Sequence, residues 1–366
     1  MASVQPKKVV LGESEAEQSA NSGYSQTAIS NRTLHWETIT VTNLGIDLGL
    51  LSNSLLFTLD VYRKTTDGIL RKMVLPPSVG LSAPNVNYAQ VLNSGADLEV
   101  SYRSSIRDFH YNIAANVSYL HNELLKLSSG VTHETISAPY GGTYINRVGE
   151  PLSAMYEYRT EVVITTKEEA QKMKAMGQGN AKIGRLRYAD ANGDGKISGD
   201  DREILGSYIP KWTCGLSLGA ELKGFDAGMV FSAVLDRQQF SPMSFQNRFP
   251  NRNQTRKWFD NRWTLGSDPQ GKYPAMIQGE SYEEMTDLMV SNTSFMKMKS
   301  LTLGYTHRFD KFIGRVFLSG ENLFTLTHKD FDGFDPENGV SPGHFTNWGG
   351  DYPTARIYLM GINLTF

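Results

Sequence analysis

The chain has 366 residues, a net charge of −2 at pH 7 and one cysteine, Cys214. This charge argues against a nucleic-acid-binding surface, and a single cysteine excludes an internal disulfide and a metal site built of cysteines alone. No stretch approaches the ~18 consecutive apolar residues of a membrane-spanning helix, so any membrane crossing must come from strands.

Residues 1–30 are polar and contain no apolar segment of the kind that signal peptides carry. We expect them to form a polar loop or an incomplete strand, and residues 31–366 to form one β domain. A secreted barrel needs a signal peptide. The sequence therefore leaves two interpretations, a cytoplasmic protein or the C-terminal part of a longer chain.

Apolar residues recur at every second position from 44 to 50 and again from 55 to 61, on either side of a Ser-Asn-Ser turn. Because side chains alternate across a strand, each set shares one face, and the two runs predict an antiparallel hairpin. The same alternation predicts further strands at 96–102, 109–119, 212–223, 225–235, 295–306, 315–325 and 356–366. Within 295–306 the apolar parity shifts between Met298 and Leu301, which predicts a bulge.

These strands run about ten residues, the length that a tilted strand needs to cross a bilayer. Short turns alternate with long connections at 127–208 and 236–293. This alternation is typical of transmembrane barrels. The first connection contains a capping-box pattern at Thr166–Glu169 and a glycine stop at Gly177, which predict a short helix. The fold class is all-β and antiparallel, and alternation alone leaves a membrane barrel and a soluble sandwich both open.

The last strand keeps its apolar face to the final residue. A continuous apolar face of this kind suits a strand in contact with lipid, and it resembles the C-terminal signal by which outer-membrane barrels are recognised for assembly. The expected signal residues are Tyr358, Met360, Ile362, Leu364 and Phe366.

Residues 190–201 follow the twelve-residue pattern of calcium-binding loops, with a glycine, Gly195, at the position of the sharp turn. Position twelve is Asp201 in place of the usual glutamate. The pattern predicts a structural Ca²⁺ site, and a metal-free turn rich in Asp and Asn is the alternative. The expected ligands are Asp190, Asn192, Asp194, Lys196 (through its carbonyl), Ser198 (through a water) and Asp201.

No catalytic constellation stands out, so we expect no enzyme activity. The seven histidines lack zinc-site spacing, and neither a nucleophile elbow nor a phosphate loop is present. Two tryptophans in the second long connection, Trp258 and Trp263, have the chemistry to stack on sugar rings. Packing within the loop or an interfacial belt is the alternative that the sequence favours.

Several motifs together resemble the C-terminal half of SusC/RagA-type TonB-dependent outer-membrane transporters of Bacteroidetes-like bacteria. The likeness extends in order from about residue 31 to residue 366. Its motifs are Leu34–Thr38 with Thr42–Asp47, Asp190–Gly195 with Leu205–Gly206 and Ile209–Trp212, Ser294–Tyr305, Ser319–Phe324, Gly333–Glu337, Tyr352–Pro353 and the last strand.

The resemblance implies a barrel of about 22 strands, roughly half of it supplied by this chain, around a plug absent from the sequence. It implies import of a nutrient, a glycan or oligosaccharide or else a peptide, with a SusD-like lipoprotein as partner and TonB as the source of energy. Inner-face residues such as Asp47, Asp97 and Glu99 and the long loops would contact ligand. We expect the chain to be inactive alone, since lipid cannot satisfy two open sheet edges.

A second hypothesis from another class stays open. Calcium-stabilised, soluble all-β modules outside the cell bind or hydrolyse polysaccharides, and the strands and the loop at 190–201 also suit such a module. The two hypotheses differ in whether the apolar faces meet lipid or a protein core.

Overall fold

The chain is described by a computed structural model that covers residues 4–11, 19–27, 29–73, 77–128, 130–137, 142–241, 253–265, 273–277, 285–331, 333–337 and 353–366. Its main element is a nine-stranded antiparallel sheet with the strand order β19-β18-β17-β14-β13-β6-β5-β4-β3. The strands are β3 (Thr38–Leu50), β4 (Leu55–Lys72), β5 (Asn85–Ile106), β6 (Phe109–Leu127), β13 (Trp212–Leu222), β14 (Phe225–Leu235), β17 (Phe295–Arg308), β18 (Ile313–Thr327) and β19 (Ile357–Thr365).

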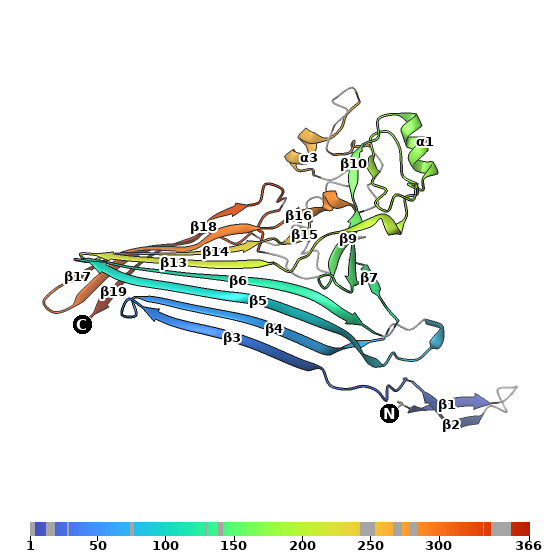
Figure 1. Ribbon diagram of the computed structural model, residues 1–366, viewed down its shortest axis with the longest axis horizontal. Helices are drawn as coiled ribbons and strands as arrows, with labels where there is room; N and C mark the ends of the chain where they lie inside the picture. The colour runs from blue at the N-terminus through green and yellow to red at the C-terminus, as the bar shows by residue number, and fades with distance from the viewer. Residues whose placement is uncertain are drawn as a thin grey trace.

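All the short turns lie at one end of this sheet and the long connections at the other, as Figure 1 shows. In the β13–β14 turn, Lys223 and Gly224 have φ values of 49° and 88°. Two consecutive positive φ angles fit the tight turn whose twist matches that of the flanking strands. The predicted hairpins are therefore confirmed.

The bulge predicted in β17 is also present. The pairing of β17 with β18 shifts between Met298 and Ser300, and its pairing with β14 shifts between Val230 and Phe231. Strands β4, β5 and β6 have 18, 22 and 19 residues, well beyond the ten expected. Their extra length continues past the alternating segments toward the long connections.

The long connections fold into a separate small domain beyond that end of the sheet (Figure 1). It contains a four-stranded sheet of order β12-β9-β8-β7 and two two-stranded sheets. The elements are β7 (His133–Ser137), β8 (Thr143–Arg147), β9 (Ala154–Tyr158), β10 (Thr160–Val163), α1 (Lys167–Ala175), β11 (Leu186–Tyr188), β12 (Arg202–Gly206), β15 (Gln238–Phe240), α3 (Arg256–Asn261) and β16 (Val290–Asn292), with 3-10 turns at Gly199–Asp201 and Asp287–Met289. A further 3-10 turn, Pro77–Val79, lies in the connection between β4 and β5.

Helix α1 begins where the sequence predicts. The Thr166 side chain accepts a hydrogen bond from the backbone N–H of Glu169 at 3.1 Å, and the Glu169 carboxylate accepts one from the N–H of Thr165. Gly177, with φ of 112°, follows the helix. The alternation of apolar residues did not predict the short strands of this domain, because strands of three to five residues contain too few alternating positions.

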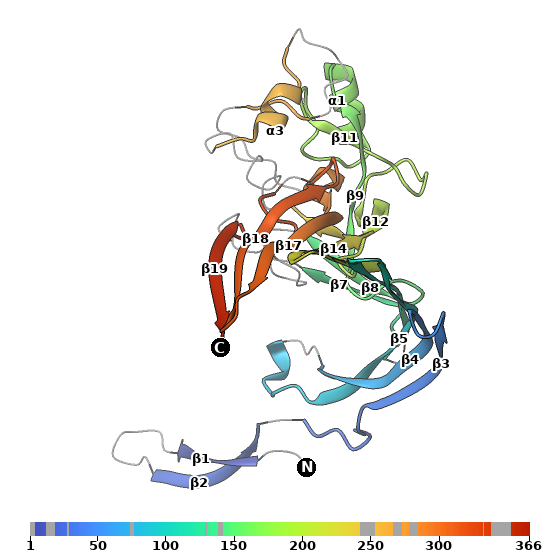
Figure 2. The same cartoon turned by 90° about the vertical axis from the view of Figure 1, so that its left-hand side faces the viewer.

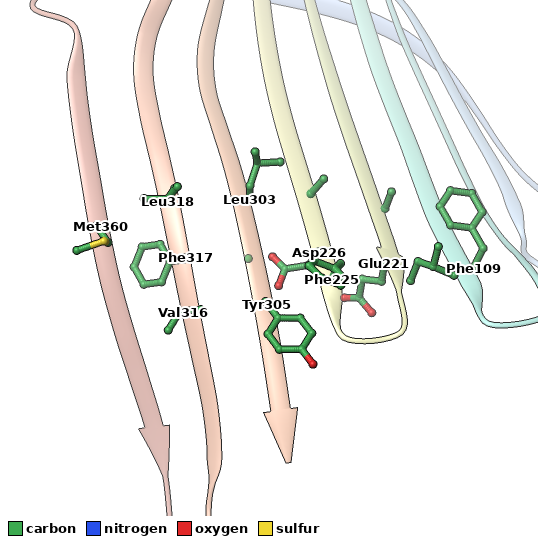
Figure 3. Close-up of a pocket in the computed structure, with 14 residues that line it drawn as sticks. Phe109, Glu221, Phe225, Asp226, Leu303, Tyr305, Val316, Phe317, Leu318 and Met360 are labelled. Atoms are coloured by element: carbon green, nitrogen blue, oxygen red, sulfur yellow. The ribbon is translucent and has the colours of Figure 1, made fainter. Parts of the chain in front are cut away.

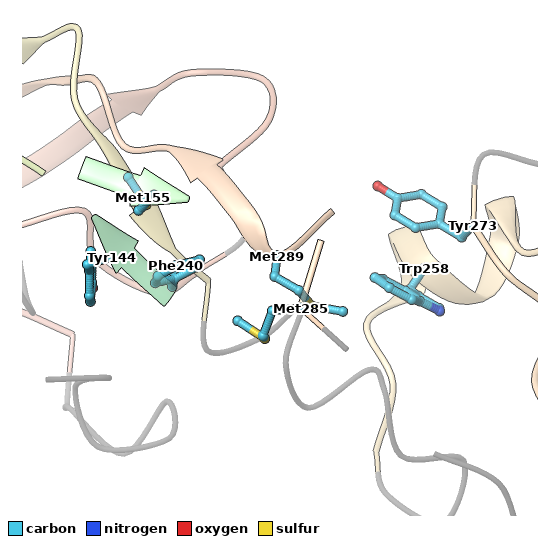
Figure 4. Packing of buried hydrophobic residues seen from close by; sticks show 7 residues of the cluster. All are labelled: Tyr144, Met155, Phe240, Trp258, Tyr273, Met285 and Met289. Atoms are coloured by element: carbon cyan, nitrogen blue, oxygen red, sulfur yellow. The ribbon is translucent and has the colours of Figure 1, made fainter. Parts of the chain in front are cut away.

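An apolar cluster ties the two long connections together (Figure 4). Tyr144 packs edge-on against Phe240 with ring centroids 5.2 Å apart, and Trp258 lies 4.6 Å from Tyr273. The cluster consists of Tyr144, Met155, Phe240, Trp258, Tyr273, Met285 and Met289. Residues from both long connections thus pack in one cluster, so the loops are a folded unit.

The nine-stranded sheet curves into an open trough with β3 and β19 at its two edges (Figure 2). A hairpin of β1 (Val4–Leu11) and β2 (Ser19–Gln26) lies outside this sheet. Half of a 22-stranded barrel would be about eleven strands, and the sheet has nine. Among the helices that the structure describes, none has the length and apolar character needed to cross a bilayer.

Candidate functional site

The two faces of the nine-stranded sheet differ in chemistry. On one face Leu216 lies opposite Phe231 and Leu218 opposite Met229, and on the other Gly219 lies opposite Gly228. The register carries this division from strand to strand, so one continuous apolar surface covers the outside of the trough. We call it the outer face, and the polar side the inner face.

The outer face is exposed and broad. At the two edges of the sheet, Leu364 is 53% exposed, Leu44 is 70% exposed and Met360 is 76% exposed. A soluble monomer rarely exposes more than a few hundred Å² of contiguous apolar surface. The outer face therefore needs an apolar environment, and lipid supplies one.

Aromatic pairs mark both borders of the apolar band. Tyr119 and Trp212 lie 4.7 Å apart at the loop end, and Phe225 and Tyr305 lie 4.6 Å apart at the turn end. The eleven residues of β13 rise roughly 36 Å, which a tilt of about 45° reduces to roughly 25 Å. This matches the height of the apolar band on outer-membrane barrels.

The five residues of the predicted assembly signal all lie on β19 or directly after it. Tyr358 is opposite Gly320, Met360 opposite Leu318 and Ile362 opposite Val316, so their side chains share the outer face. Strand β19 is an edge of the sheet, and its role as an assembly signal stays a prediction.

Acidic side chains collect on the inner face of β3, β4 and β5. Asp60 lies opposite Asp97, and Glu99 lies opposite Thr58. Thr58 donates a hydrogen bond to Asp47 at 2.7 Å. The structure thus brings together the three acids that the sequence assigned to the inner face and adds Asp60. This part of the inner face is a negatively charged wall.

Near the turn end, an ion pair crosses the inner face of three strands. Arg315 on β18 donates to both carboxylate oxygens of Asp226 on β14, at 3.0 and 2.6 Å. The pair passes over Gly304 of β17, where a Cβ atom would lie 2.6 Å from the Arg315 guanidinium. A glycine is needed there because the two charged groups occupy its side-chain space. The pair lines an inner hollow of about 740 Å³.

At the loop end, a buried cation fastens the segment that leads out of β18. Lys297 of β17 is 1% exposed and donates to Asp335 at 3.1 Å and to Glu337 at 2.6 Å. Asp335 also accepts from the backbone N–H of Thr354 at 3.1 Å. Burial alone would raise the pKa of Asp335, but hydrogen bonds from Thr354, Glu337 and Lys297 hold it below its ordinary value. We call Lys297, Asp335 and Glu337 the clamp. The sequence did not predict it, although Asp335 and Glu337 lie in a motif of the family resemblance.

A polar cavity of about 330 Å³ lies in the loop domain. Its wall includes two cations, Arg159 and Lys257, and the carboxylate of Asp287. Asp287 accepts two hydrogen bonds from Thr160, at 2.6 and 3.2 Å, yet burial raises its pKa above the ordinary value. The cavity opens among the connections that precede β13 and β17, and its charged lining suits a polar ligand on the loop side.

In the loop at 190–201, the side chains bind the loop's own backbone. Asp190 accepts N–H groups of Gly193 and Gly195 at 2.8 and 2.9 Å, and buried Asp201 accepts those of Ala191 and Ser198 at 3.0 and 2.7 Å. In the described part of the chain, no three His, Cys, Asp or Glu side chains gather as a metal site does. The side-chain oxygens of this loop are the kind of ligand that Ca²⁺ prefers. Their hydrogen bonds to the backbone also hold the loop in its shape.

The two tryptophans are packed inside the loop domain. Trp258 is 1% exposed within the apolar cluster of Figure 4, and Trp263 is buried against Val163 and Leu186. Of the three roles that the sequence allowed, loop packing is the one that the structure supports.

The architecture, with its lipid-suited outer face, polar inner face, short turns and folded long loops, defines a β-barrel membrane protein. The family model for the β-barrel of TonB dependent receptor-like proteins matches residues 11–323. The chain belongs to this family, and it is an outer-membrane protein of the SusC/RagA type. Family membership decides against the soluble polysaccharide module.

Among curated proteins, the chain is 29% identical to TonB-dependent receptor P3 of Formosa agariphila, covering 93% of the chain and 35% of the relative. It is 24% identical to TonB-dependent receptor SusC of Bacteroides thetaiotaomicron, covering 92% and 32%. The chain thus spans about a third of the length of these relatives. No catalytic function is indicated by them.

Among solved structures, the RagAB peptide transporter matches 99% of the chain and 38% of its own, with a TM-score of 0.72 and 24% identity. The RagAB peptide importer in the 'closed-closed' state matches with a TM-score of 0.73 at the same identity. These likenesses show the fold.

Proposed function

We propose that this chain forms the C-terminal part of the barrel of a TonB-dependent importer that takes up a nutrient through the outer membrane. The observation that carries the proposal is the division of the nine-stranded sheet into an apolar outer face and a polar, acidic inner face. A wall of this kind separates lipid from a wet passage.

The nutrient that we propose is a glycan or oligosaccharide, with a peptide as the second candidate. The matching structures, which are of a peptide transporter, support the peptide candidate. The glycan candidate rests on the resemblance to the SusC/RagA family. On the loop side, the cavity with Arg159, Lys257 and Asp287 offers donors and acceptors to either ligand. A SusD-like lipoprotein would cover the loop domain, and TonB would act on a part of the protein outside this chain.

The experiment uses the full-length transporter that contains this chain. A strain lacking its gene is grown on oligosaccharides or on peptides as the sole source of carbon, and uptake of the labelled ligand is measured with and without TonB. We expect loss of uptake for one of the two classes and rescue by the intact gene. Equal growth and uptake in the two strains on every ligand would refute the import function.

A matched pair of variants tests the loop cavity. Lys257→Gln removes a cation from its wall and is expected to weaken ligand binding, whereas Arg256→Gln changes a neighbour whose side chain is 93% exposed and pairs with Asp260. Isothermal titration of the detergent-solubilised transporter with the imported ligand compares them. Equal affinities would remove the cavity from the binding surface.

We further propose that Ca²⁺ binds the loop at 190–201 and has a structural role there. The order of oxygen-bearing residues and the positive φ of Gly195, 79°, support this proposal. Calorimetric titration of the full-length protein with Ca²⁺ is expected to show binding that Asp190→Ala and Asp194→Ala abolish. Identical heats for the three proteins would refute the site.

A further inference from the structure

A groove of about 650 Å³ interrupts the outer face near the turn end of the sheet. Figure 3 shows its lining side chains spread over neighbouring strands from β6 to β19, close to the short turns. Its apolar lining comes from the outer-face positions of these strands, among them Ala220, Leu222, Phe225, Ala227 and Leu318.

The register explains why the groove forms at this place. One row across the outer face consists of Tyr111, Ala220, Ala227, Leu303, Leu318 and Met360, each paired with the next. Two alanines stand side by side in a row of otherwise bulky residues. The notch that they leave is bounded below by Leu222 and Phe225, which are opposite each other one row nearer to the turn.

A cation stands directly below the groove. Lys223 occupies the tip of the turn that joins Leu222 to Phe225, and it is exposed. Among the described residues it takes part in no ion pair. Beside it, Tyr305 contacts the ring of Phe225 at 4.6 Å, as expected for an aromatic belt at the membrane–water border.

The distances suit one kind of occupant. Lys223 at the turn tip lies three positions after Ala220, a rise of roughly 10 Å along the strand. A phosphate at the height of Lys223 would therefore place the first part of its acyl chain at Ala220 and Ala227. Short turns face the periplasm in outer-membrane barrels, so the surrounding leaflet is the inner one, which contains phospholipid.

We propose that the groove is a binding site for one phospholipid, with an acyl chain over Ala220 and Ala227 and the phosphate on Lys223. The bound lipid stays with the barrel when the surrounding lipid exchanges. The site follows from the outer-membrane location of the chain and is independent of the nutrient that the protein imports.

The test is native mass spectrometry of the full-length transporter after exchange into a detergent without phospholipid. We expect about one retained phospholipid per barrel in the wild type. Ala227→Leu adds three carbons to the floor and displaces about three methylene groups, which lowers retention roughly 50-fold because each buried methylene contributes a factor of about four. Ala220→Leu on the paired strand is the second variant and is expected to act alike.

The first control makes the same substitution outside the groove. Ala233→Leu lies on the same strand and face as Ala227, opposite Cys214, and is expected to retain the lipid. Lys223→Gln tests the cation and is expected to lower retention. Its control, Lys311→Gln in the β17–β18 turn, is expected to leave retention unchanged. Heat-modifiable gel mobility confirms that each variant is folded.

A wild-type barrel that carries no phospholipid after the exchange would overturn the proposal without reference to any variant. Equal retention by wild type, Ala227→Leu and Ala233→Leu would overturn it as well. If Lys223→Gln retained as much lipid as the wild type, the assignment of the phosphate to Lys223 would be wrong.

Discussion

The buried clamp at Lys297 leads to the sharpest prediction about local stability. The change is Lys297→Met, which keeps the length of the side chain and removes its charge. Asp335 and Glu337 then remain in their partly buried places without the cation that both contact. Breaking a buried ion pair by removing one partner costs about 3–5 kcal/mol, because the remaining charge is left uncompensated.

Hydrogen exchange measures this loss where it occurs. If the segment around Asp335 opens locally, a loss of about 3–5 kcal/mol raises its exchange rate by roughly two to four orders of magnitude. The peptides to follow in the full-length transporter are those that contain 333–337 and 353–357. Peptides from β13 and β14 should keep their protection.

The neighbouring lysine is the control. Lys299 also contacts Glu337, but its side chain is 37% exposed. An exposed pair contributes about 0–1 kcal/mol, so Lys299→Met should change the exchange less than about tenfold. If Lys297→Met exchanged no faster than Lys299→Met, the clamp would have no energetic role.

The same clamp has a defined pH dependence. Burial would raise the pKa of Glu337, but hydrogen bonds from Lys297 and Lys299 and the charges of these lysines hold it below its ordinary value. Burial would likewise raise the pKa of Asp335, and hydrogen bonds from Thr354, Glu337 and Lys297 hold it below its ordinary value. A carboxyl group whose pKa falls on folding stabilises the folded state above its unfolded pKa, about 4, and loses this contribution as the pH falls further. Protection of 333–337, corrected for intrinsic exchange, should be constant from about pH 7 to 5 and fall below about pH 4. A loss already complete at pH 5 would contradict the assignment.

Three further predictions concern the barrel wall. Leu218→Lys on the outer face should cost about 2–4 kcal/mol and lower the amount of heat-modifiable barrel in the outer membrane, whereas Ser217→Lys on the inner face should not. Gly304→Ala should break the Arg315–Asp226 pair and cost about 1–3 kcal/mol in urea unfolding, while Gly228→Ala, with no atom within 4 Å of its added Cβ, should be tolerated. Phe366→Ala should lower barrel assembly, measured as the same heat-modifiable form, and Thr365→Ala should not; equal levels would refute the C-terminal signal.

The sequence predicted the wall of the barrel well because alternation and turn residues are local signals. The strands around Leu216 and Met229 and the bulge after Met298 could be placed from side-chain parity alone. The loop domain was missed for the opposite reason. Its core joins residues as distant as Tyr144 and Met289, and no local pattern records such a contact.

The candidate sites divide in the same way. Asp47, Asp97 and Glu99 were placed on the inner face by counting in twos, and the structure has them there. Lys297 sits on a strand of known parity, yet its partners come from a loop about forty residues later. The groove near Lys223 also depends on the register of β13 and β14, because only the pairing places Ala220 beside Ala227.

The direction of the two edge strands leads to a last prediction. All neighbours in the nine-stranded sheet are antiparallel, so its first and ninth strands, β3 and β19, run the same way. A barrel that closes by antiparallel pairing at both edges therefore needs an odd number of further strands, and about 13 would complete a 22-stranded barrel. Two copies of this sheet that are inserted in the same orientation could meet only through parallel seams. The chain expressed alone should accordingly form no heat-modifiable barrel in lipid, while co-expression with an odd-stranded remainder of the barrel should restore one; a closed dimer of the chain alone would refute the argument.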